Sequence, residues 1–389
     1  MASGDPSQQS APTQILAAAD ALIAEIGTNR QRSEAERRLA PAIVSGIQAG
    51  SLQRLMLPAA DGGLEAPLPT ALDVYERLAG SDPSVAWVVW NNALPCLFSR
   101  FLAPEVRRQI FADPHWLHAS STRPSGKAER TASGYRLNGR WSLVSGCELA
   151  EWMPLTGLVA PEGGGAPEMR YFFMHRAEVE ILDTWHVGGL RGTGSHDVVV
   201  ADALVPEAHS LSPTDQSTAA GPYGRLPIIA TLSLGMAAQF LGIGRAALAA
   251  TTAQAAGAIT DTPVPDMRDR PEVQAGVAGQ QAALDAARSH LHAQAARLWA
   301  QAQTDAAFEP IDIAPVFAAS WHAIGSATAA VDALYSLAGT AAIYQDNPLE
   351  RLSRDLRVMR QHVLTQSLWP EQSGRVMLGL PVNNPLYAV

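Results

Sequence analysis

The spacing of apolar residues changes twice along the chain and predicts three regions. From about residue 13 to 111, apolar side chains recur every three or four positions, as at Leu16, Ala19, Leu22 and Ile26, which is typical of amphipathic helices. From about 117 to 222, short runs that alternate apolar and polar residues lie between turn formers, which predicts strands. From about 226 to 379, long alanine-rich windows again have helical spacing and indicate a closely packed bundle.

The order of helices, strands and helices predicts an α+β protein that is mainly α. We expect an N-terminal helical domain at 1–116, a middle antiparallel β-sheet domain at 117–222 and a C-terminal helical bundle at 223–389. In the middle domain, Asn138-Gly139 separates two alternating runs, which predicts a β-hairpin at this dipeptide. The segment 242–247 reads GIGRAA and matches a dinucleotide-binding fingerprint, but it lies inside a helical window. We therefore interpret its glycines as sites of close helix packing.

Composition narrows the function. The chain has 389 residues, of which 47% are hydrophobic and 17% charged, a balance that excludes a disordered protein. Its net charge is −9 and no dense Lys/Arg cluster is present, which argues against nucleic-acid binding. Two cysteines make neither a disulfide framework nor a zinc site, so we expect no metal and a reducing compartment. The first residues lack the layout of a secretory signal and no apolar run reaches about 18 residues, so we expect a cytoplasmic protein without a membrane span.

Three local patterns, far apart in the sequence, carry the candidate chemistry. The first is WSLVSGC at 141–147, preceded by ASSTRPSG at 119–126. The second is GGLRGTGSHD at 188–197, before an expected strand. The third begins with LAGT at 337–340 and continues with PLER at 348–351, Arg354-Asp355 and Gln361-His362.

Together these patterns resemble those of the acyl-CoA dehydrogenase fold superfamily. Within it, the chain is most similar to the two-component flavin-dependent monooxygenases, whose oxygenase component acts on small aromatic compounds. The resemblance covers about Leu16 to Gly379. It implies reduced FMN or FAD as the cofactor, O2 as co-substrate, a separate flavin reductase as partner and a homotetramer.

One position separates this branch from the dehydrogenases. A dehydrogenase of this fold needs a carboxylate that removes a proton beside a thioester, but the matching segment reads Arg360-Gln361-His362-Val363-Leu364. The monooxygenase branch has a histidine there, which implies that His362 is catalytic. An imidazole that titrates near neutrality suits a proton role where O2 adds to reduced flavin as a C4a-(hydro)peroxide. A buried structural histidine is the competing interpretation.

The resemblance also implies cofactor contacts. The Ser145 hydroxyl would face flavin N5 as a second catalytic group, with Gly146 allowing close backbone approach, although an ordinary strand serine is the alternative. Trp141 would lie close to the flavin or wall off the strand. Arg191 would meet a phosphate or hold a loop. The remaining expected cofactor contacts are Ser121 and, toward the flavin of a neighbouring subunit, Gly339 and Thr340.

We expect a flat substrate near the indoles of Trp87 and Trp90, which share a helix face and could stack on an aromatic or heterocyclic ring. Core packing of these indoles is the alternative. Ser120 and Asn92 would also contact the substrate. Leu94 stands where the family's phenol hydroxylases have a histidine, which disfavours a phenol that must be deprotonated.

The sequence thus predicts the oxygenase component of a two-component flavin-dependent monooxygenase that oxygenates a small aromatic or heterocyclic compound. One alternative is a dehydrogenase-type flavoprotein that oxidises an acyl thioester. A second is a non-catalytic binding protein of the same fold.

Overall fold

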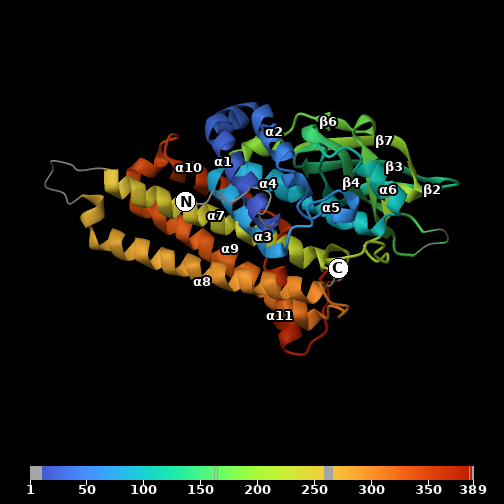
Figure 1. Ribbon diagram of the computed structural model, residues 1–389. Coiled ribbons are helices and arrows are strands. Elements are labelled where there is room, and N and C mark those ends of the chain that lie inside the picture. The colour runs from blue at the N-terminus through green and yellow to red at the C-terminus, as the bar shows by residue number, and fades with distance from the viewer. Residues whose placement is uncertain (1–10, 162, 164, 258–265, 385, 388–389) are drawn as a thin grey trace, which may run out of the picture.

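The computed structural model describes residues 11–161, 163, 165–257, 266–384, 386 and 387. The prediction about a secretory signal rests on residues 1–14, of which 1–10 lie outside this range. Helices at both ends of the chain flank a sheet formed by its middle part (Figure 1). The N-terminal helices are α1 (Ala11–Glu36), α2 (Pro41–Ala49), α3 (Leu68–Ser81), α4 (Pro83–Asn91), α5 (Ala93–Phe98) and α6 (Pro104–Ile110).

Local signals fix the start of α4, the helix that bears the two indoles. Asp82 precedes it in an extended conformation, and its carboxylate accepts a hydrogen bond from the backbone N–H of Ser84 at 2.8 Å. Pro83 then occupies the first helical position, where its missing N–H costs nothing. Every residue of the helix except Asn91 is buried, so both indoles pack closely against neighbouring elements.

The middle of the chain forms one twisted eight-stranded sheet. Its strands are β1 (Leu117–His118), β2 (Ser121–Thr131), β3 (Gly134–Val144), β4 (Ala150–Val159), β5 (Glu168–His175), β6 (Glu180–Leu182), β7 (His196–Pro206) and β8 (Ser210–Leu211). They pair in the order β6-β7-β3-β2-β4-β5-β8, with β1 beside β4.

Two expectations about this sheet are corrected. It is not wholly antiparallel, because β4 runs parallel to both β1 and β2. The hairpin turn between β2 and β3 falls at residues 132–133 rather than at Asn138-Gly139. Asn138 instead lies within β3, where the register shifts between Leu137 and Gly139 and the Asn138 side chain accepts a hydrogen bond from the Asp202 backbone. The Asn-Gly pair thus marks a β-bulge, an alternative use of turn residues.

The C-terminal helices are α7 (Ile228–Gly257), α8 (Pro271–Ala302), α9 (Pro310–Ala338), α10 (Pro348–Met359) and α11 (Leu368–Met377). Helices α7, α8 and α9 lie side by side and extend well beyond the sheet (Figure 1). A Cβ at Gly242 in α7 would lie 2.1 Å from the carbonyl oxygen of Glu76 in α3. The glycines of 242–247 therefore serve close helix packing, as predicted.

Helix α7 corrects the expectation about apolar length. By length and composition it could cross a membrane, the one such helix among the described residues. However, 89% of its most apolar window is buried inside the protein, which is typical of a core helix.

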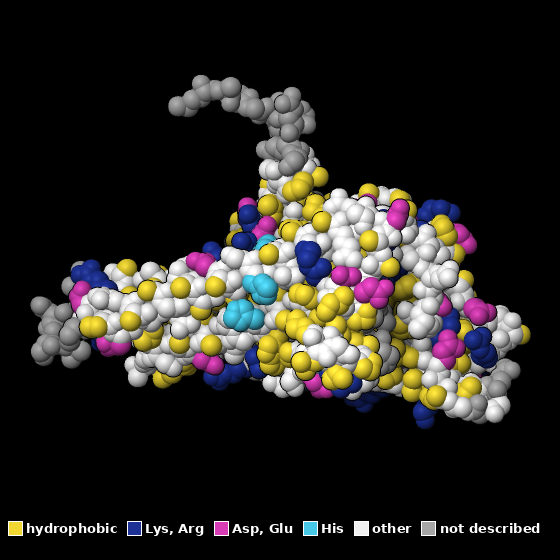
Figure 2. Space-filling model, turned by 90° about the horizontal axis from the view of Figure 1, so that it is seen from below, with side chains coloured by type: hydrophobic (Ala, Val, Ile, Leu, Met, Phe, Trp, Pro, Cys, Tyr) yellow, Lys and Arg dark blue, Asp and Glu magenta, His cyan; other side chains and the backbone are white. Residues whose placement is uncertain are grey.

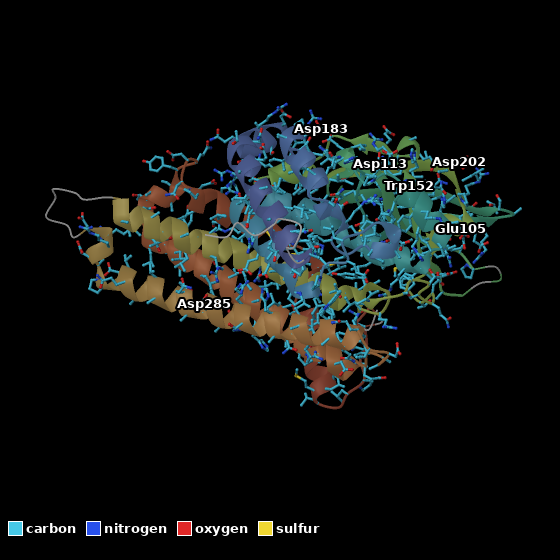
Figure 3. All side chains as sticks on the ribbon, viewed as in Figure 1. Glu105, Asp113, Trp152, Asp183, Asp202 and Asp285 are labelled. Atoms are coloured by element: carbon cyan, nitrogen blue, oxygen red, sulfur yellow. The ribbon has the colours of Figure 1, made fainter. Side chains whose placement is uncertain are left out.

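The sheet and the N-terminal helices meet at several polar contacts. Arg37, just after α1, donates two hydrogen bonds to Asp183, which follows β6, at 2.5 and 3.0 Å. Asp183 lies at the outer side of this junction (Figure 3). Asn92, at the end of α4, accepts a hydrogen bond from the backbone N–H of His118 in β1 at 2.7 Å. These contacts place α4 against the sheet.

Candidate active site

Side chains from the three predicted regions meet around Trp87 of α4. Its indole N–H donates to the hydroxyl of Ser145, at the end of β3, with 2.9 Å between the two atoms. The ring of His362 stands edge-on to the same indole, with 5.4 Å between ring centroids. The structure therefore brings both predicted catalytic residues to one side chain, although they are 217 positions apart in sequence.

Trp90 completes an aromatic cluster around the histidine. Its ring centroid lies 5.4 Å from that of Trp87 and 5.6 Å from that of His362, and both indoles meet the imidazole nearly at right angles. Its own N–H donates to the Leu232 carbonyl at the start of α7, at 3.2 Å. Edge-to-face rings are favourable because the positive edge of one meets the negative face of another.

The tautomer of His362 follows from its backbone. The residue caps the 3-10 helix η12 (Val363–Thr365), and its Nδ1 accepts a hydrogen bond from the Leu364 N–H at 3.2 Å. In the neutral ring the proton is therefore on Nε2. Nε2 has no hydrogen-bond partner among the described residues. The residue as a whole is partly exposed, and this N–H is the group that it can offer to a ligand.

The charge of His362 differs from the sequence-based expectation. Burial among protein atoms and, to a lesser extent, the nearby positive charge of Arg123 together lower its pKa to about 4. The imidazole is thus neutral at pH 7 rather than titrating near neutrality. In this state it acts as a hydrogen-bond donor through Nε2.

Ser145 is held by a turn at 188–195, which includes the 3-10 helix η7 (Arg191–Thr193). The Ser145 hydroxyl lies 2.8 Å from the Ser195 hydroxyl, and the Gly146 N–H donates to the Thr193 carbonyl at 2.8 Å. Gly146 has φ of 74°, a left-handed conformation that favours glycine. The backbone after β3 therefore fits this turn closely.

Helix α10 anchors the same turn. The carboxylate of Asp355 accepts the Leu190 N–H at 2.7 Å, and Arg354 donates to the Gly188 carbonyl at 2.6 Å. A Cβ at Gly189 would lie 2.6 Å from the Arg354 carbonyl oxygen, so only glycine allows this approach. Because α10 ends three residues before His362, one helix positions both the Ser145 turn and the imidazole.

Two predicted contacts are corrected. The indole of Trp141 is fully buried in the sheet's own apolar core and donates to the Thr156 carbonyl, so it walls off the strand and offers no surface to a cofactor. The amide of Asn92 is only 1% exposed, and its two ends bond to His118 N–H and to the Val88 carbonyl. It ties α4 to the sheet and has no free group for a substrate.

The other predicted residues lie in different settings. Arg191 holds a loop, since its Nε donates to the Glu34 carbonyl beside the buried carboxylates of Asp82 and Asp355. Ser120 is 7% exposed and its hydroxyl has no hydrogen-bond partner among the described residues. Ser121 accepts a weak bond from the Arg123 N–H at 3.4 Å. On the surface at the end of α9 lie Gly339 and Thr340.

Sequence reasoning missed two side chains near the site. Leu143 is 49% exposed although it lies in β3 two residues before Ser145, and its φ of 62° is unusual for a leucine. Arg123 lies where six residues of β2, Ser121 to Gly126, oppose only three residues of β4, Leu155 to Gly157. Its guanidinium is exposed and makes no ion pair or side-chain hydrogen bond among the described residues. Both belong to quoted motifs, but spacing alone did not single them out.

These features suit a reduced flavin. An exposed apolar side chain at the end of β3 offers a surface for a flat ring. Within the described part of the chain, three polar groups of this site have no partner: the Nε2–H of His362, the Ser120 hydroxyl and the Arg123 guanidinium. The positive charge of Arg123 favours an anionic ring or phosphate. The residues present therefore fit a flavin, and they would hold its ring between β3 and the end of α10.

The comparisons with known proteins agree with this geometry. Residues 234–367 match the family model described as acyl-CoA dehydrogenase, C-terminal domain. The chain is 28% identical to an indole-3-acetate monooxygenase of Pseudomonas putida, over 95% of this chain and 96% of that protein. It matches the solved structure of XiaF from a Streptomyces species, in complex with FADH2 and glycerol, with a TM-score of 0.90 and 27% identity over 96% of this chain and 97% of that one.

A pigment production hydroxylase of Rhodococcus erythropolis is 30% identical to this protein, over 90% of this chain and 91% of that protein. The chain belongs to the two-component flavin-dependent monooxygenases of the acyl-CoA dehydrogenase fold superfamily. The chain has the order expected of this fold, with helices at both ends of the sequence and a mixed sheet in its middle. The predictions of the fold class, of flavin-dependent monooxygenase activity and of reduced flavin with O2 are thereby confirmed.

Proposed function

We propose that this protein is the oxygenase component that takes up reduced FMN or FAD from a separate reductase and oxygenates a small aromatic or heterocyclic compound. When bound, the reduced flavin supplies the two electrons that let one oxygen atom of O2 enter the substrate while the other leaves as water. The observation that carries the proposal is the meeting of Ser145, Trp87 and His362 between β3, α4 and the end of α10.

The chain's own residues would then divide the work. With a reduced flavin bound, the Ser145 hydroxyl would face flavin N5, and the neutral His362 would donate a hydrogen bond through Nε2 to the flavin or to O2. Trp87 and Trp90 form an apolar wall that excludes water, which limits wasteful loss of hydrogen peroxide. The unpartnered hydroxyl of Ser120 is the candidate group for orienting the substrate.

The acyl-thioester dehydrogenase alternative conflicts with the chemistry of His362. That reaction needs a base whose free lone pair can remove a proton from carbon. Nδ1 is occupied by the Leu364 N–H, and Nε2 carries the proton. This imidazole therefore suits donation and does not suit proton abstraction.

We also propose that the protein is a homotetramer and works in the cytoplasm. Large apolar side chains of the C-terminal region are exposed, which suits burial against further copies of the chain: Ile311, Trp321, Ile343, Tyr344, Met377, Leu378 and Leu380. Hydrophobic side chains gather near the middle of the face seen in Figure 2. Exposed Gly339 and Thr340 could then reach a neighbour's flavin. Both cysteines are free and buried, which suits a reducing compartment.

Purified protein provides the test. We expect it to be nearly colourless as isolated, to bind added reduced FMN or FAD under anaerobic conditions, and to consume O2 only when reduced flavin is supplied. His362→Ala should bind reduced flavin but release a larger share of the consumed O2 as hydrogen peroxide. A yellow protein whose colour is bleached by an acyl-CoA would support the dehydrogenase instead.

A further inference from the structure

The hydroxyl of Ser145 is the first member of a chain of three buried hydroxyl groups. Ser145 Oγ lies 2.8 Å from Ser195 Oγ, which lies 2.7 Å from Thr193 Oγ1. The Thr193 hydroxyl in turn donates to the Leu190 carbonyl at 2.9 Å. All three side chains are at most 6% exposed, so water does not compete for these bonds. The direction of the chain decides which group Ser145 offers to a ligand.

The protons of the chain can be counted. Because a carbonyl only accepts, the Thr193 hydroxyl donates its one hydrogen to the Leu190 carbonyl and must accept a hydrogen bond from Ser195. The Ser195 hydroxyl then donates its hydrogen to Thr193 and accepts a hydrogen bond from Ser145. The indole N–H of Trp87 already occupies one lone pair of Ser145. Ser145 is left with one free lone pair and no free proton.

The opposite direction would make Ser145 a donor. Thr193 would give its proton to Ser195, and Ser195 would give its own to Ser145. Both lone pairs of Ser145 would then be occupied, by Trp87 N–H and by Ser195, and only its proton would remain. This arrangement loses the bond from Thr193 to the Leu190 carbonyl, so the acceptor direction is favoured by that bond.

The end of the chain is fixed in place. Leu190 has φ of 51°, and its carbonyl also accepts the Thr193 N–H at 3.1 Å and the Trp185 indole N–H at 3.2 Å. Its own N–H is held by the Asp355 carboxylate. The chain ends on a carbonyl, which cannot pass a proton onward. It therefore orients Ser145 and does not conduct protons.

We propose that this hydroxyl chain makes Ser145 a hydrogen-bond acceptor toward flavin N5 and so makes the site select reduced over oxidised flavin. The inference rests on the proposed function, in which Ser145 faces N5. In reduced flavin N5 carries a hydrogen and donates, whereas in oxidised flavin N5 is bare and accepts. This selection suits an oxygenase that receives its flavin from a reductase, because oxidised flavin is released after the reaction and reduced flavin binds in its place. Thr193 and Ser195 are positioning residues for this selection.

The test compares the dissociation constants of oxidised and reduced FMN, the latter measured anaerobically, in the wild type and in Thr193→Val. Valine matches threonine in shape but accepts no hydrogen bond, so Ser195 turns its proton to Ser145 and Ser145 becomes a donor. We expect the ratio of the oxidised to the reduced Kd to fall by about fivefold or more, the effect of roughly one hydrogen bond. In Ser195→Ala, Ser145 loses its hydroxyl neighbour and can either donate or accept a hydrogen bond. This variant should therefore give an intermediate ratio.

Two controls sharpen the result. Thr251→Val removes another buried hydroxyl and should leave the ratio unchanged, because among the described residues this hydroxyl bonds to the Ala247 carbonyl within α7 alone. With 5-deaza-FMN, in which carbon replaces N5, Thr193→Val should also leave the ratio unchanged. This analogue separates a hydrogen bond to N5 from a general distortion of the site.

The outcomes separate the inference from the proposed function. If the wild type does not bind reduced FMN, the proposed function fails. If the wild type binds reduced FMN but Thr193→Val leaves the ratio as it was, or changes it equally with 5-deaza-FMN, the hydroxyl chain does not select the redox state and only this inference is overturned. If Thr193→Val does not fold, the wild type is compared with the two cofactors. Its ratio of oxidised to reduced Kd should be smaller for 5-deaza-FMN than for FMN, and equal ratios would overturn the inference.

Discussion

The indole N–H of Trp87 donates to the hydroxyl of Ser145 across the boundary between helix α4 and strand β3, over 2.9 Å. Both groups are buried, so each would lose its hydrogen-bond partner if the other were removed. This bond joins the N-terminal helices to the strand that presents the candidate catalytic hydroxyl. It gives the site a fixed shape before any ligand binds.

A double-mutant cycle with Trp87→Phe and Ser145→Ala should detect this bond. We expect each single variant to lower the free energy of unfolding, and the double variant to lose less than the sum, with a coupling of about 1 kcal/mol. Denaturant unfolding of the four proteins measures it. Fully additive losses would show that the two side chains act independently.

Substitution of Gly189 should break the contact between α10 and the turn at 188–195 that holds Ser145. In Gly189→Ala the new Cβ would lie 2.6 Å from a backbone carbonyl of Arg354, which cannot move aside, so we expect a loss of about 1–3 kcal/mol of stability and weaker binding of reduced flavin. Gly188→Ala is the matched control, since a Cβ there meets nothing within 4 Å. Equal effects of the two variants would refute the close approach.

His362 should affect stability in acid. Its pKa falls from 6.5 to about 4 on folding, so between these values the unfolded chain binds a proton that the native protein does not. The contribution of His362 to the free energy of unfolding is therefore complete above about pH 6.5 and is lost as the pH falls to about 4. His362→Gln should remove this dependence. A wild-type-minus-variant difference that stays constant from pH 4 to 7 would contradict the assignment.

Asp355 should have the opposite effect. Burial raises its pKa from 3.8 to about 7, so in this range the native protein keeps a proton that the unfolded chain has lost. The stability that Asp355 contributes is thus complete below about pH 4 and declines as the pH rises to about 7. Asp355→Asn, which keeps an acceptor for the Leu190 N–H, should flatten this slope in unfolding experiments. If the free energy of unfolding of Asp355→Asn falls with pH as steeply as that of the wild type, the group with the raised pKa is not Asp355.

Much of the architecture could be predicted because periodicity reports local structure directly. The long alanine-rich windows are the helices α7, α8 and α9, and the Gly242 segment packs against α3 as expected. Sheet pairing was harder. Asn138-Gly139 has the residues of a tight turn, but the same residues serve a bulge, and only contacts with β7 distant in sequence decide between the two.

Those residues of the candidate site that lie in recognisable sequence motifs could be predicted. His362, Ser145, Trp87 and Trp90 were named from the sequence, and the structure gathers them around one indole. Trp141 and Asn92 were misjudged because burial depends on tertiary packing, which residue type and spacing do not reveal. The charge of His362 was misjudged for the same reason, since surrounding protein lowers its pKa. The hydroxyl chain from Ser145 to Thr193 joins two motifs and appears only in three dimensions.

The most direct test of the oxygenase assignment follows the oxygen atoms. The protein would be supplied with reduced FMN or FAD and isotopically labelled O2, together with a panel of small aromatic and heterocyclic compounds that includes indole and indole-3-acetate. We predict that mass spectrometry will find a product carrying one atom from the labelled gas, and less of it with Ser145→Ala or His362→Ala. A panel left unchanged, with all consumed O2 recovered as hydrogen peroxide, would contradict the assignment.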